Sequence, residues 1–218
     1  MRWLWIATLA ITAFFLFFPR LDITLSSAFF SFPEHNIEPQ GFAAQQSKPW
    51  VRAIFLWVRY LSVAYVVLFL AVGIYKRCFG LAWISWRQWS YLGLVLLAGN
   101  FLMVDIIGKD FLHRPRPRDI TEFRGALDYV PPLHIGTQEG KSAASGHAAF
   151  GFYFAAFAFL CRRRTPLYIL GVALGLGIGF TRIMAGGHFA SDVLFTGLIM
   201  LWTIHLLAWI ILRERNNA

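Results

Sequence analysis

Charged side chains are scarce in this sequence. Asp, Glu, Lys and Arg together make up 14% of its 218 residues, whereas hydrophobic residues make up 58%. Soluble domains carry about a quarter of their residues as charges. The shortage argues against a soluble globular domain and indicates a chain that lies in lipid.

Cysteine is scarcer still, and the chain contains only Cys78 and Cys161. Neither belongs to a Cys-x-x-Cys pair or to a metal-binding spacing. Both lie beside basic clusters, which mark the cytoplasmic ends of membrane helices, and thiols in the cytoplasm stay reduced. We therefore expect neither a disulfide nor a metal site.

The few charges that are present are mostly basic, and the formal net charge is +9. In a soluble protein this balance would favour a nucleic-acid partner. Here topology and contact with anionic lipid headgroups explain the basic residues, and no basic face is interleaved with aromatic residues. We expect no nucleic-acid partner, and no pattern indicates an obligate protein partner.

Long apolar runs take the place of the missing charge. A helix of about 20 apolar residues crosses a bilayer. The runs predict an all-α fold in which residues 1–218 form a single membrane-embedded bundle of six transmembrane helices, with two longer polar segments, 19–52 and 109–146. The predicted spans are 3–18, 53–75, 91–108, 147–161, 166–184 and 189–212. We expect the first span to be retained, because no small-residue cleavage site follows it.

Basic residues near the span ends predict the orientation of the chain. The cluster Arg162–Arg164 and the tail residues Arg213 and Arg215 place these ends, together with both termini, in the cytoplasm. The two polar segments then lie on the other side. In a bacterium that side is the periplasmic face of the inner membrane.

Three polar stretches fall on that one face: "KDFLHRPRP" (109–117), "AASGHAAF" (143–150) and "TRIMAGGHFASD" (181–192). They supply Lys109, Arg116, Ser145, Gly146, His147, Arg182, His188 and Asp192. The three cations can hold a tetrahedral phosphate dianion. The N-termini of spans four and six would direct free amides at the same anion.

The two histidines and the acid provide the chemistry. His188 and Asp192 are four residues apart and share a helical face. A carboxylate that accepts from one imidazole nitrogen leaves the other nitrogen nucleophilic, and His147 can then protonate a leaving alcohol. These parts indicate phosphoryl transfer through a phosphohistidine, without a metal ion or a cofactor.

The three stretches resemble the three-part signature of the type 2 phosphatidic acid phosphatase family. The first part is Lys, six residues and Arg-Pro; the second is Pro-Ser-Gly-His; the third is Ser-Arg, five residues, His, three residues and Asp. Ala144 stands where Pro is usual and Thr181 where Ser is usual. The resemblance implies a helical membrane bundle that removes phosphate without a metal ion.

The same resemblance implies a role for each matched residue. His188 is the expected nucleophile, Asp192 its partner and His147 the general acid. The expected phosphate ligands are Lys109, Arg116, Ser145, Gly146 and Arg182.

The wider features "FPRLDI" (18–23), "EFRG" (122–125) and "GGHFASDV" (186–193) are similar to bacterial lipid A phosphatases, particularly those of the 4′ kind. They favour lipid A as the anionic lipid substrate. Undecaprenyl diphosphate, phosphatidylglycerol phosphate and phosphatidate stay open as alternatives. In the loop, candidate headgroup contacts are His113, Arg114 and Arg124.

Other classes of protein remain to be weighed against a phosphatase. A lipid phosphotransferase would use the same residues with a lipid alcohol in place of water. A transporter is disfavoured, because the charges gather at span ends rather than near the middle of the bilayer. A non-catalytic lipid-binding protein is disfavoured because every catalytic residue of the signature is present.

Overall fold

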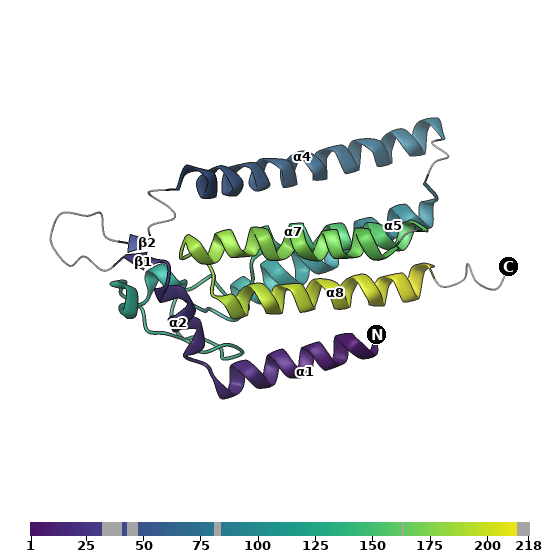
Figure 1. The fold of residues 1–218 in the computed structure, drawn as a ribbon. Helices are drawn as coiled ribbons and strands as arrows, with labels where there is room; N and C mark the ends of the chain where they lie inside the picture. The colour runs from purple at the N-terminus through teal and green to yellow at the C-terminus, as the bar shows by residue number, and fades with distance from the viewer. Residues whose placement is uncertain (32–40, 43–47, 81–83, 163, 213–218) are drawn as a thin grey trace.

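Helices make up almost all the regular structure of the chain. The computed structural model describes residues 1–31, 41–42, 48–80, 84–162 and 164–212, without the side chains of Lys109 and Asp110. The long helices run along one common direction in Figure 1. They are α1 (Arg2–Phe17), α4 (Pro49–Phe79), α5 (Trp86–Leu94) continued by the π-helix η1 (Val95–Phe111), α6 (Gly146–Tyr153) continued by the 3₁₀ helix η4 (Phe154–Leu160), α7 (Arg164–Met184) and α8 (Ala190–Leu212).

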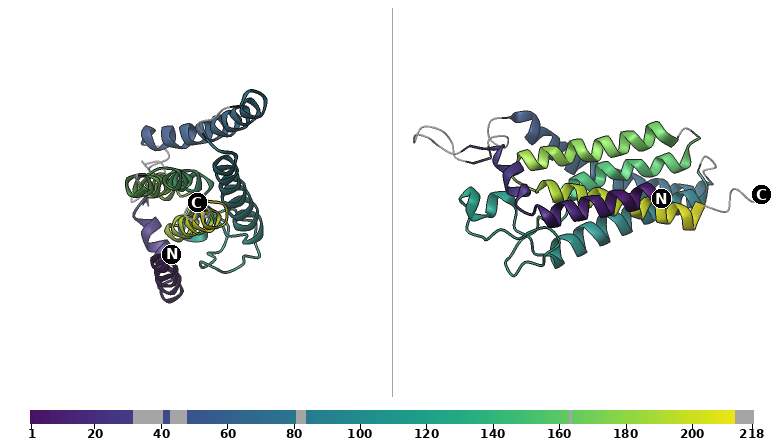
Figure 2. Two further views of the ribbon diagram at one scale, coloured as in Figure 1. Left: turned by 90° about the vertical axis from the view of Figure 1, so that its right-hand side faces the viewer. Right: turned by 60° about the horizontal axis from the view of Figure 1, so that its bottom comes forward.

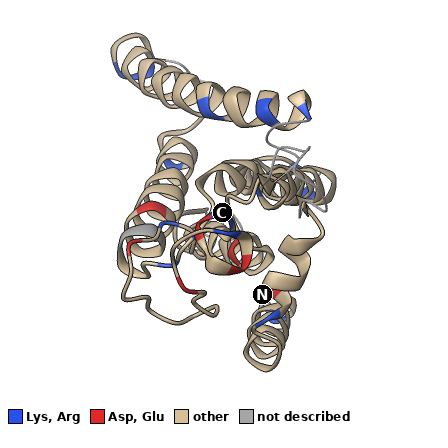
Figure 3. Cartoon of the chain, turned by 90° about the vertical axis from the view of Figure 1, so that its left-hand side faces the viewer, with Lys and Arg blue, Asp and Glu red and all other residues tan. Residues whose placement is uncertain are grey.

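The short elements gather at one end of this bundle, at the left of Figure 1. They are α2 (Leu21–Ser27), the antiparallel pair β1 (Phe30–Ser31) and β2 (Gly41–Phe42), and the 3₁₀ helices η2 (Pro117–Asp119) and η3 (Thr121–Phe123). Residue Met1 and the last residues of α8 lie at the other end. The loop between η1 and α6 and the start of α8 therefore share one end, which Figure 3 views with its acidic and basic residues coloured.

All six predicted spans coincide with helices, which confirms the all-α class. Four helical segments are long and apolar enough to cross a membrane: Pro49–Phe79, Trp86–Gly108, Arg164–Met184 and Ala190–Leu212. The pair α1 and α2 passes the same test only when taken together, and it bends by 85°. The segment Gly146–Leu160 is apolar but shorter. Among the described residues the structure thus supports four or five candidate spans, and a count of six is not established.

Local sequence signals explain where the helices begin and end. Pro49 opens α4, where its missing N–H costs no helical hydrogen bond, and Gly80 ends it with a left-handed φ of 73°. Ser85 caps α5 through a reciprocal pair of hydrogen bonds with Gln88. The predicted polar segment 19–52 is not entirely loop. It contains α2 and the first turn of α4.

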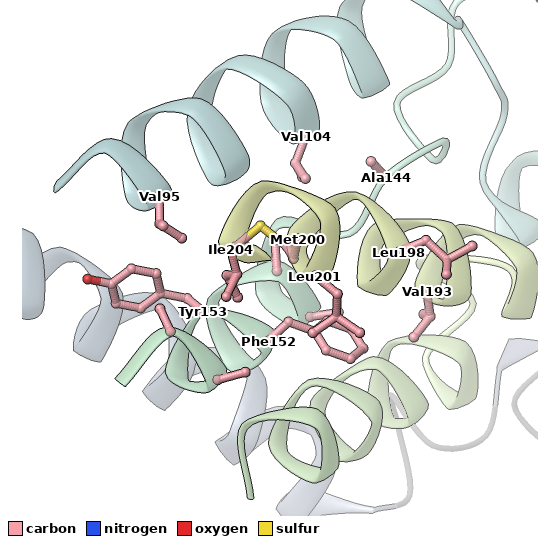
Figure 4. Close-up of a cluster of buried hydrophobic side chains, with 14 of the residues drawn as sticks. Val95, Val104, Ala144, Phe152, Tyr153, Val193, Leu198, Met200, Leu201 and Ile204 are labelled. Carbon is pink, nitrogen blue, oxygen red and sulfur yellow. The ribbon is translucent and has the colours of Figure 1, made fainter. Parts of the chain in front are cut away.

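Helix α8 lies at the centre of the bundle. The end-on view in Figure 2 shows it between α7, α1 and the α5–η1 helix, with α4 at the edge. Its buried residues Met200, Leu201 and Ile204 pack among side chains of the neighbouring helices, such as Val104 and Phe152 (Figure 4). The start of α8 is therefore held on several sides, which suits a rigid support for a functional site.

Glycines let α6 and η4 approach α7 closely. A Cβ at Gly151 would lie 2.7 Å from Cα of Gly175, a distance at which the backbones would have to separate. Small residues at such crossings are typical of membrane helices, which associate through close packing. This contact holds the last turn of α6 against the middle of α7, the two helices at whose ends two of the three polar stretches lie.

Candidate active site

A pocket of about 660 Å³ opens at the end of the bundle where the three polar stretches meet. It is lined by Val51, Arg52, Phe55, Leu56, Arg116, Arg118, Lys141, Gly146, His147, Arg182, Ala185 and His188. Five of these lining residues are cationic, two are histidines and none is an acid. The pocket is therefore built for an anion.

The turn between α7 and α8 brings His188 to this pocket. Gly186 has a φ of 60°, which a residue with a side chain rarely adopts, and a Cβ there would collide with the ring of Phe42. A Cβ at Gly187 would collide with the guanidinium group of Arg182. The two glycines thus allow a tight turn and let Arg182 lie against the backbone beside His188.

The imidazole of His188 is held by a backbone carbonyl. Its Nδ1 lies 3.0 Å from the carbonyl oxygen of Ser142, and only 5% of the residue is exposed. A carbonyl only accepts hydrogen bonds, so this contact places the proton on Nδ1. The lone pair is then on Nε2, the nitrogen that a nucleophilic role requires.

Asp192 is buried and is held by several hydrogen bonds, one of them from Ser142. Its Oδ2 accepts hydrogen bonds from the Ser142 hydroxyl at 2.6 Å and from the Phe189 amide at 2.9 Å, and its Oδ1 accepts from Arg114. Ser142 therefore contacts both residues, through its hydroxyl on one side and its carbonyl on the other. These hydrogen bonds connect the carboxylate to His188 through Ser142.

His147 lies at the start of α6 and faces the same pocket as His188. Its ring stacks on Phe55 of α4, with centroids 4.7 Å apart and planes 19° from parallel. The guanidinium carbon of Arg182 lies 4.5 Å from the centroid of the same phenyl ring. Phe55 thus contacts one expected acid and one expected phosphate ligand, although neither composition nor spacing pointed to it.

The Ser145-Gly146 pair forms the beginning of α6. The Ser145 hydroxyl caps the helix by accepting from the Ala148 amide, and its own amide donates to the Thr196 hydroxyl at 2.9 Å. Gly146 lines the pocket, and its amide lies in the first helical turn, where no earlier helical carbonyl can accept from it. Ser145 therefore holds the helix start, and Gly146 lies in the first turn of α6 at the pocket.

We expected the N-terminus of α8, like that of α6, to direct free amides at an anion, but the structure shows partners for two of its amides. The amide of Phe189 donates to Asp192, and the amide of Ser191 donates to Asp22 at 3.0 Å. Buried carboxylates rather than a ligand therefore take up these amides. Of the two helix starts expected to face the anion, α6 is the one that lines the pocket.

The expected cationic ligands contribute to the site unequally. Nε of Arg182 is buried and has no hydrogen-bond partner among the described residues, so it is available to a ligand. Burial lowers the pKa of Arg116 and neighbouring Arg118 lowers it further, but arginine stays protonated over such a range. Lys109 belongs to η1, and its side chain lies outside the described part of the chain.

Comparison with known proteins identifies the family. Residues 88–217 match the model of the PAP2 superfamily. The chain belongs to the PAP2 superfamily. It is 31% identical over 205 residues to a lipid A 4′-phosphatase of Francisella tularensis subsp. novicida (strain U112), and the alignment covers 90% of each chain. It is also 31% identical over 208 residues to a lipid A 4′-phosphatase of Rhizobium etli, covering 88% of this chain and 78% of that one.

A solved structure supports the same fold. The PAP2-type phosphatidylglycerolphosphate phosphatase of Bacillus subtilis superposes with a TM-score of 0.56 at 17% identity, covering 96% of this chain and 98% of that one. The chain is thus a phosphatase of the PAP2 superfamily, and its long apolar helices make it a multi-pass membrane protein.

The loop residues that we expected to contact a headgroup lie outside the PAP2 pocket. Arg114 is only 2% exposed, and its guanidinium group binds Asp22 and Asp192 beneath the surface. His113 and Arg124 are exposed, with left-handed φ values of 46° and 64°, and neither belongs to the described residues that line the pocket. The structure therefore places Arg114 beside Asp192 and Asp22 rather than at the pocket.

Three further cationic residues line the exposed part of the pocket. Arg52 on α4, Arg118 and Lys141 line it, and all three are exposed. Arg118 also lies 3.6 Å from the carboxylate of Asp119. Arg118 and Lys141 belong to the predicted polar segment 109–146, and Arg52 belongs to the segment 19–52, whose last residues form the first turn of α4.

No metal cluster is found within the described residues: no group of three or more His, Cys, Asp or Glu side chains is placed to hold an ion. Catalysis without a metal ion stays a prediction, which a chelator tests directly.

Sequence reasoning missed Asp22 and Ser142. Asp22 is fully buried, although it follows the first apolar run in the sequence as its first acidic residue. A lone acid at the end of a membrane span is a signal that could have identified it. Ser142 offered no such signal, because its contacts with Asp192 and His188 join residues about 50 positions apart in the sequence.

Proposed function

We propose that this PAP2 protein hydrolyses a phosphate monoester on a membrane lipid through a phosphohistidine at His188. One observation carries the proposal: a pocket with five cations and no acid among its lining residues also contains His188, whose Nδ1 contact leaves the lone pair on Nε2. The pocket binds the phosphate, and the nitrogen is oriented to attack it.

In the first step, Nε2 of His188 attacks phosphorus, and the bond from phosphorus to the lipid oxygen breaks. His147, in its protonated form, donates a proton to the leaving oxygen, so a neutral lipid alcohol departs. Arg116 and Arg182 bind the phosphoryl oxygens as negative charge builds on them, together with the Gly146 amide. Lys109 is a further ligand in this proposal.

In the second step, a water molecule attacks the phosphohistidine. His147, now neutral, accepts a proton from the water, and the bond between phosphorus and Nε2 breaks. The electron pair of that bond returns to Nε2, and inorganic phosphate leaves. His147 thus ends the cycle protonated, as it began. General acid and base catalysis of this kind contributes about 10²- to 10⁴-fold in rate.

We propose lipid A, at its 4′-phosphate, as the substrate. The support is that two relatives named lipid A 4′-phosphatases align with about nine tenths of this chain. The alternatives are undecaprenyl diphosphate, phosphatidate and phosphatidylglycerol phosphate, the last supported by the name of the structural relative. The proposed location is the periplasmic face of a bacterial inner membrane, with both termini in the cytoplasm.

The test is phosphate release by detergent-purified protein in the presence of a chelator. Lipid A, phosphatidate, phosphatidylglycerol phosphate and undecaprenyl diphosphate are compared, with His188→Ala as the inactive variant. His134→Ala is the matched control, because His134 is an exposed loop histidine outside the pocket. We expect release from lipid A, none from His188→Ala and an acid-labile phosphoenzyme in the wild type.

Each part of the proposal can fail separately. Wild-type rates in His188→Ala would refute the phosphohistidine. Release from another of the four lipids alone would replace lipid A as substrate. Transfer of phosphate to an added lipid alcohol, without release, would make the protein a phosphotransferase. Activity lost in chelator and restored by a divalent ion would show that a metal ion takes part.

A further inference from the structure

A buried cluster of charges lies behind His188, on the side away from the pocket. Asp22 is 0% exposed, Arg114 2% and Asp192 2%. They come from α2, from the loop after η1 and from the first turn of α8. Buried charges are costly unless each has a partner, so the contacts of this cluster decide what it does.

Arg114 joins the two carboxylates. One terminal nitrogen of its guanidinium group donates to Asp22 Oδ2 at 2.8 Å. The other terminal nitrogen donates to Asp192 and to the Ser191 hydroxyl. Burial disfavours the charge of Arg114, but Asp192 and Asp22 outweigh this effect and raise its pKa, so it stays protonated.

Asp22 completes the cluster from α2. Its Oδ1 accepts from the Ser191 amide at 3.0 Å, and its Oδ2 accepts from the Ser191 hydroxyl as well as from Arg114. Asp22 therefore fastens α2 to the start of α8. With both aspartates ionised, two carboxylates surround one guanidinium group, and the cluster has one formal negative charge in excess.

The negatively charged cluster is joined to His188 by two short contacts of Ser142. Asp192 accepts from the Ser142 hydroxyl at 2.6 Å, and the carbonyl of the same Ser142 lies 3.0 Å from Nδ1 of His188. When Nε2 forms its bond to phosphorus, the ring still carries the proton on Nδ1. The imidazole therefore gains a positive charge in that step.

The pocket side of His188 opposes this positive charge. The basic residues that line the pocket with it are Arg52, Arg116, Arg118, Lys141, Arg182 and His147. These cations attract the phosphate but repel a cationic imidazole. Without Asp22, the charge of Arg114 would cancel that of Asp192, and no net negative charge would remain behind the ring.

We propose that Asp22 and Arg114 are positioning residues of the reaction: they set the net charge behind His188 to minus one, which stabilises the imidazole as it takes up the phosphoryl group. This inference rests on the proposed function. It also assigns a role to α2, because Asp22 reaches the cluster only when α2 lies across the start of α8.

The first test is Asp22→Asn, which makes the cluster neutral. We expect kcat to fall about tenfold or more with little change in KM. The acid limb of kcat/KM, which reports the protonation of free His188, should move to lower pH by about one unit, because the cationic ring is stabilised less. A purely structural role would lower activity equally at every pH and leave the limb in place.

A second variant changes the charge in the opposite direction. Arg114→Gln leaves two carboxylates unopposed, so the acid limb should move to higher pH. The double variant Asp22→Asn with Arg114→Gln restores one net negative charge, and its limb should return toward that of the wild type. Shifts of both single variants in the same direction, or none in either, would overturn the inference.

The matched control is Ser26→Ala. Ser26 lies on the same helix as Asp22 and is also 0% exposed, but its hydroxyl has no hydrogen-bond partner among the described residues. We expect wild-type kinetics and an unchanged acid limb. If Ser26→Ala moved the limb as Asp22→Asn does, packing of α2 rather than the charge of Asp22 would be responsible.

Failure of this inference can be told from failure of the proposed function. The proposed function fails if the wild type forms no phosphoenzyme or if His188→Ala keeps its activity. If the wild type forms the phosphoenzyme and the limb of Asp22→Asn does not move, the inference alone fails.

Discussion

At the scale of single residues, the site depends on one serine that serves two neighbours. The Ser142 hydroxyl donates to Asp192, while its carbonyl lies 3.0 Å from Nδ1 of His188. The carbonyl belongs to the backbone and survives any substitution. The carboxylate of Asp192 belongs to a side chain and can be removed by substitution. Mutation can therefore separate the two contacts.

We predict that Asp192→Asn lowers kcat roughly 10²-fold or more, because it removes a charge that stabilises the cationic ring. Ser142→Ala should cost much less, about tenfold, since the carbonyl that holds Nδ1 remains. The measurement is kcat for both variants on the same lipid, with protein folding monitored by thermal unfolding. Equal losses would mean that the Ser142 hydroxyl transmits the whole effect of Asp192.

The sequence predicted residues with a recognisable spacing better than those without one. His147, His188, Arg116 and Arg182 line one pocket, as the spacing of the three stretches implied. The Asp22–Ser191 contact joins residues 169 positions apart, and no local pattern can reveal such a pair. Arg114 was identified as polar and near the site, but whether it faces solvent or the interior depends on the fold of the loop.

At the scale of elements, the turn between α7 and α8 sets the distance between Arg182 and His188. Gly187 leaves room for the guanidinium group of Arg182, which a Cβ would displace. The turn is closed by the Gly187 amide, which donates to the Arg182 carbonyl at 2.9 Å. Arg182 therefore depends on this turn for its position.

We predict that Gly187→Ala raises KM about tenfold or more, because the guanidinium group moves away from the phosphate. Gly177→Ala is the matched control on α7, since a Cβ there meets nothing within 4 Å. That variant should keep wild-type kinetics and gain slightly in stability. The measurement is KM together with the unfolding temperature, and an unchanged KM in Gly187→Ala would refute the role of the turn.

Helix α4 contributes to the site by a different route. It lies at the edge of the bundle (Figure 2), and its Phe55 ring contacts both His147 and Arg182. An apolar wall of this kind limits the orientations of the imidazole without binding the phosphate. Its effect should therefore appear in turnover.

We predict that Phe55→Ala lowers kcat by roughly tenfold, because His147 loses the ring that orients it for proton transfer. Trp57→Ala is the control: Trp57 lies on the same helix but is 64% exposed and is not one of the described residues that line the pocket. Rates are to be compared at saturating lipid. A similar loss in both variants would point to displacement of the whole helix.

The helices themselves were predictable, whereas their irregularities were not. Apolar runs in the sequence coincide with helical segments, because a chain in lipid must satisfy its backbone hydrogen bonds internally. The 85° bend between α1 and α2 was missed, since the residues after Phe17 are polar enough to resemble a simple loop. That bend is what carries Asp22 toward α8.

At the scale of the whole molecule, the pocket that contains His188 and the two cysteines lie at opposite ends of the bundle. Cys78 is in the last turn of α4 and Cys161 follows η4, and both are exposed. The loop before α6 lies at the other end, beside α2 and the β1–β2 pair (Figure 1). If the bundle spans the membrane, a reagent that cannot cross it will reach only one of these ends.

We predict that a membrane-impermeant maleimide leaves Cys78 and Cys161 unlabelled in intact spheroplasts and labels them after permeabilisation. With both cysteines replaced by Ser, Glu139→Cys should be labelled without permeabilisation, because Glu139 is exposed in the loop on the pocket side. The native cysteines thus serve as the internal control for membrane integrity. The reverse pattern would place the pocket in the cytoplasm and would exclude a substrate phosphate displayed on the periplasmic leaflet.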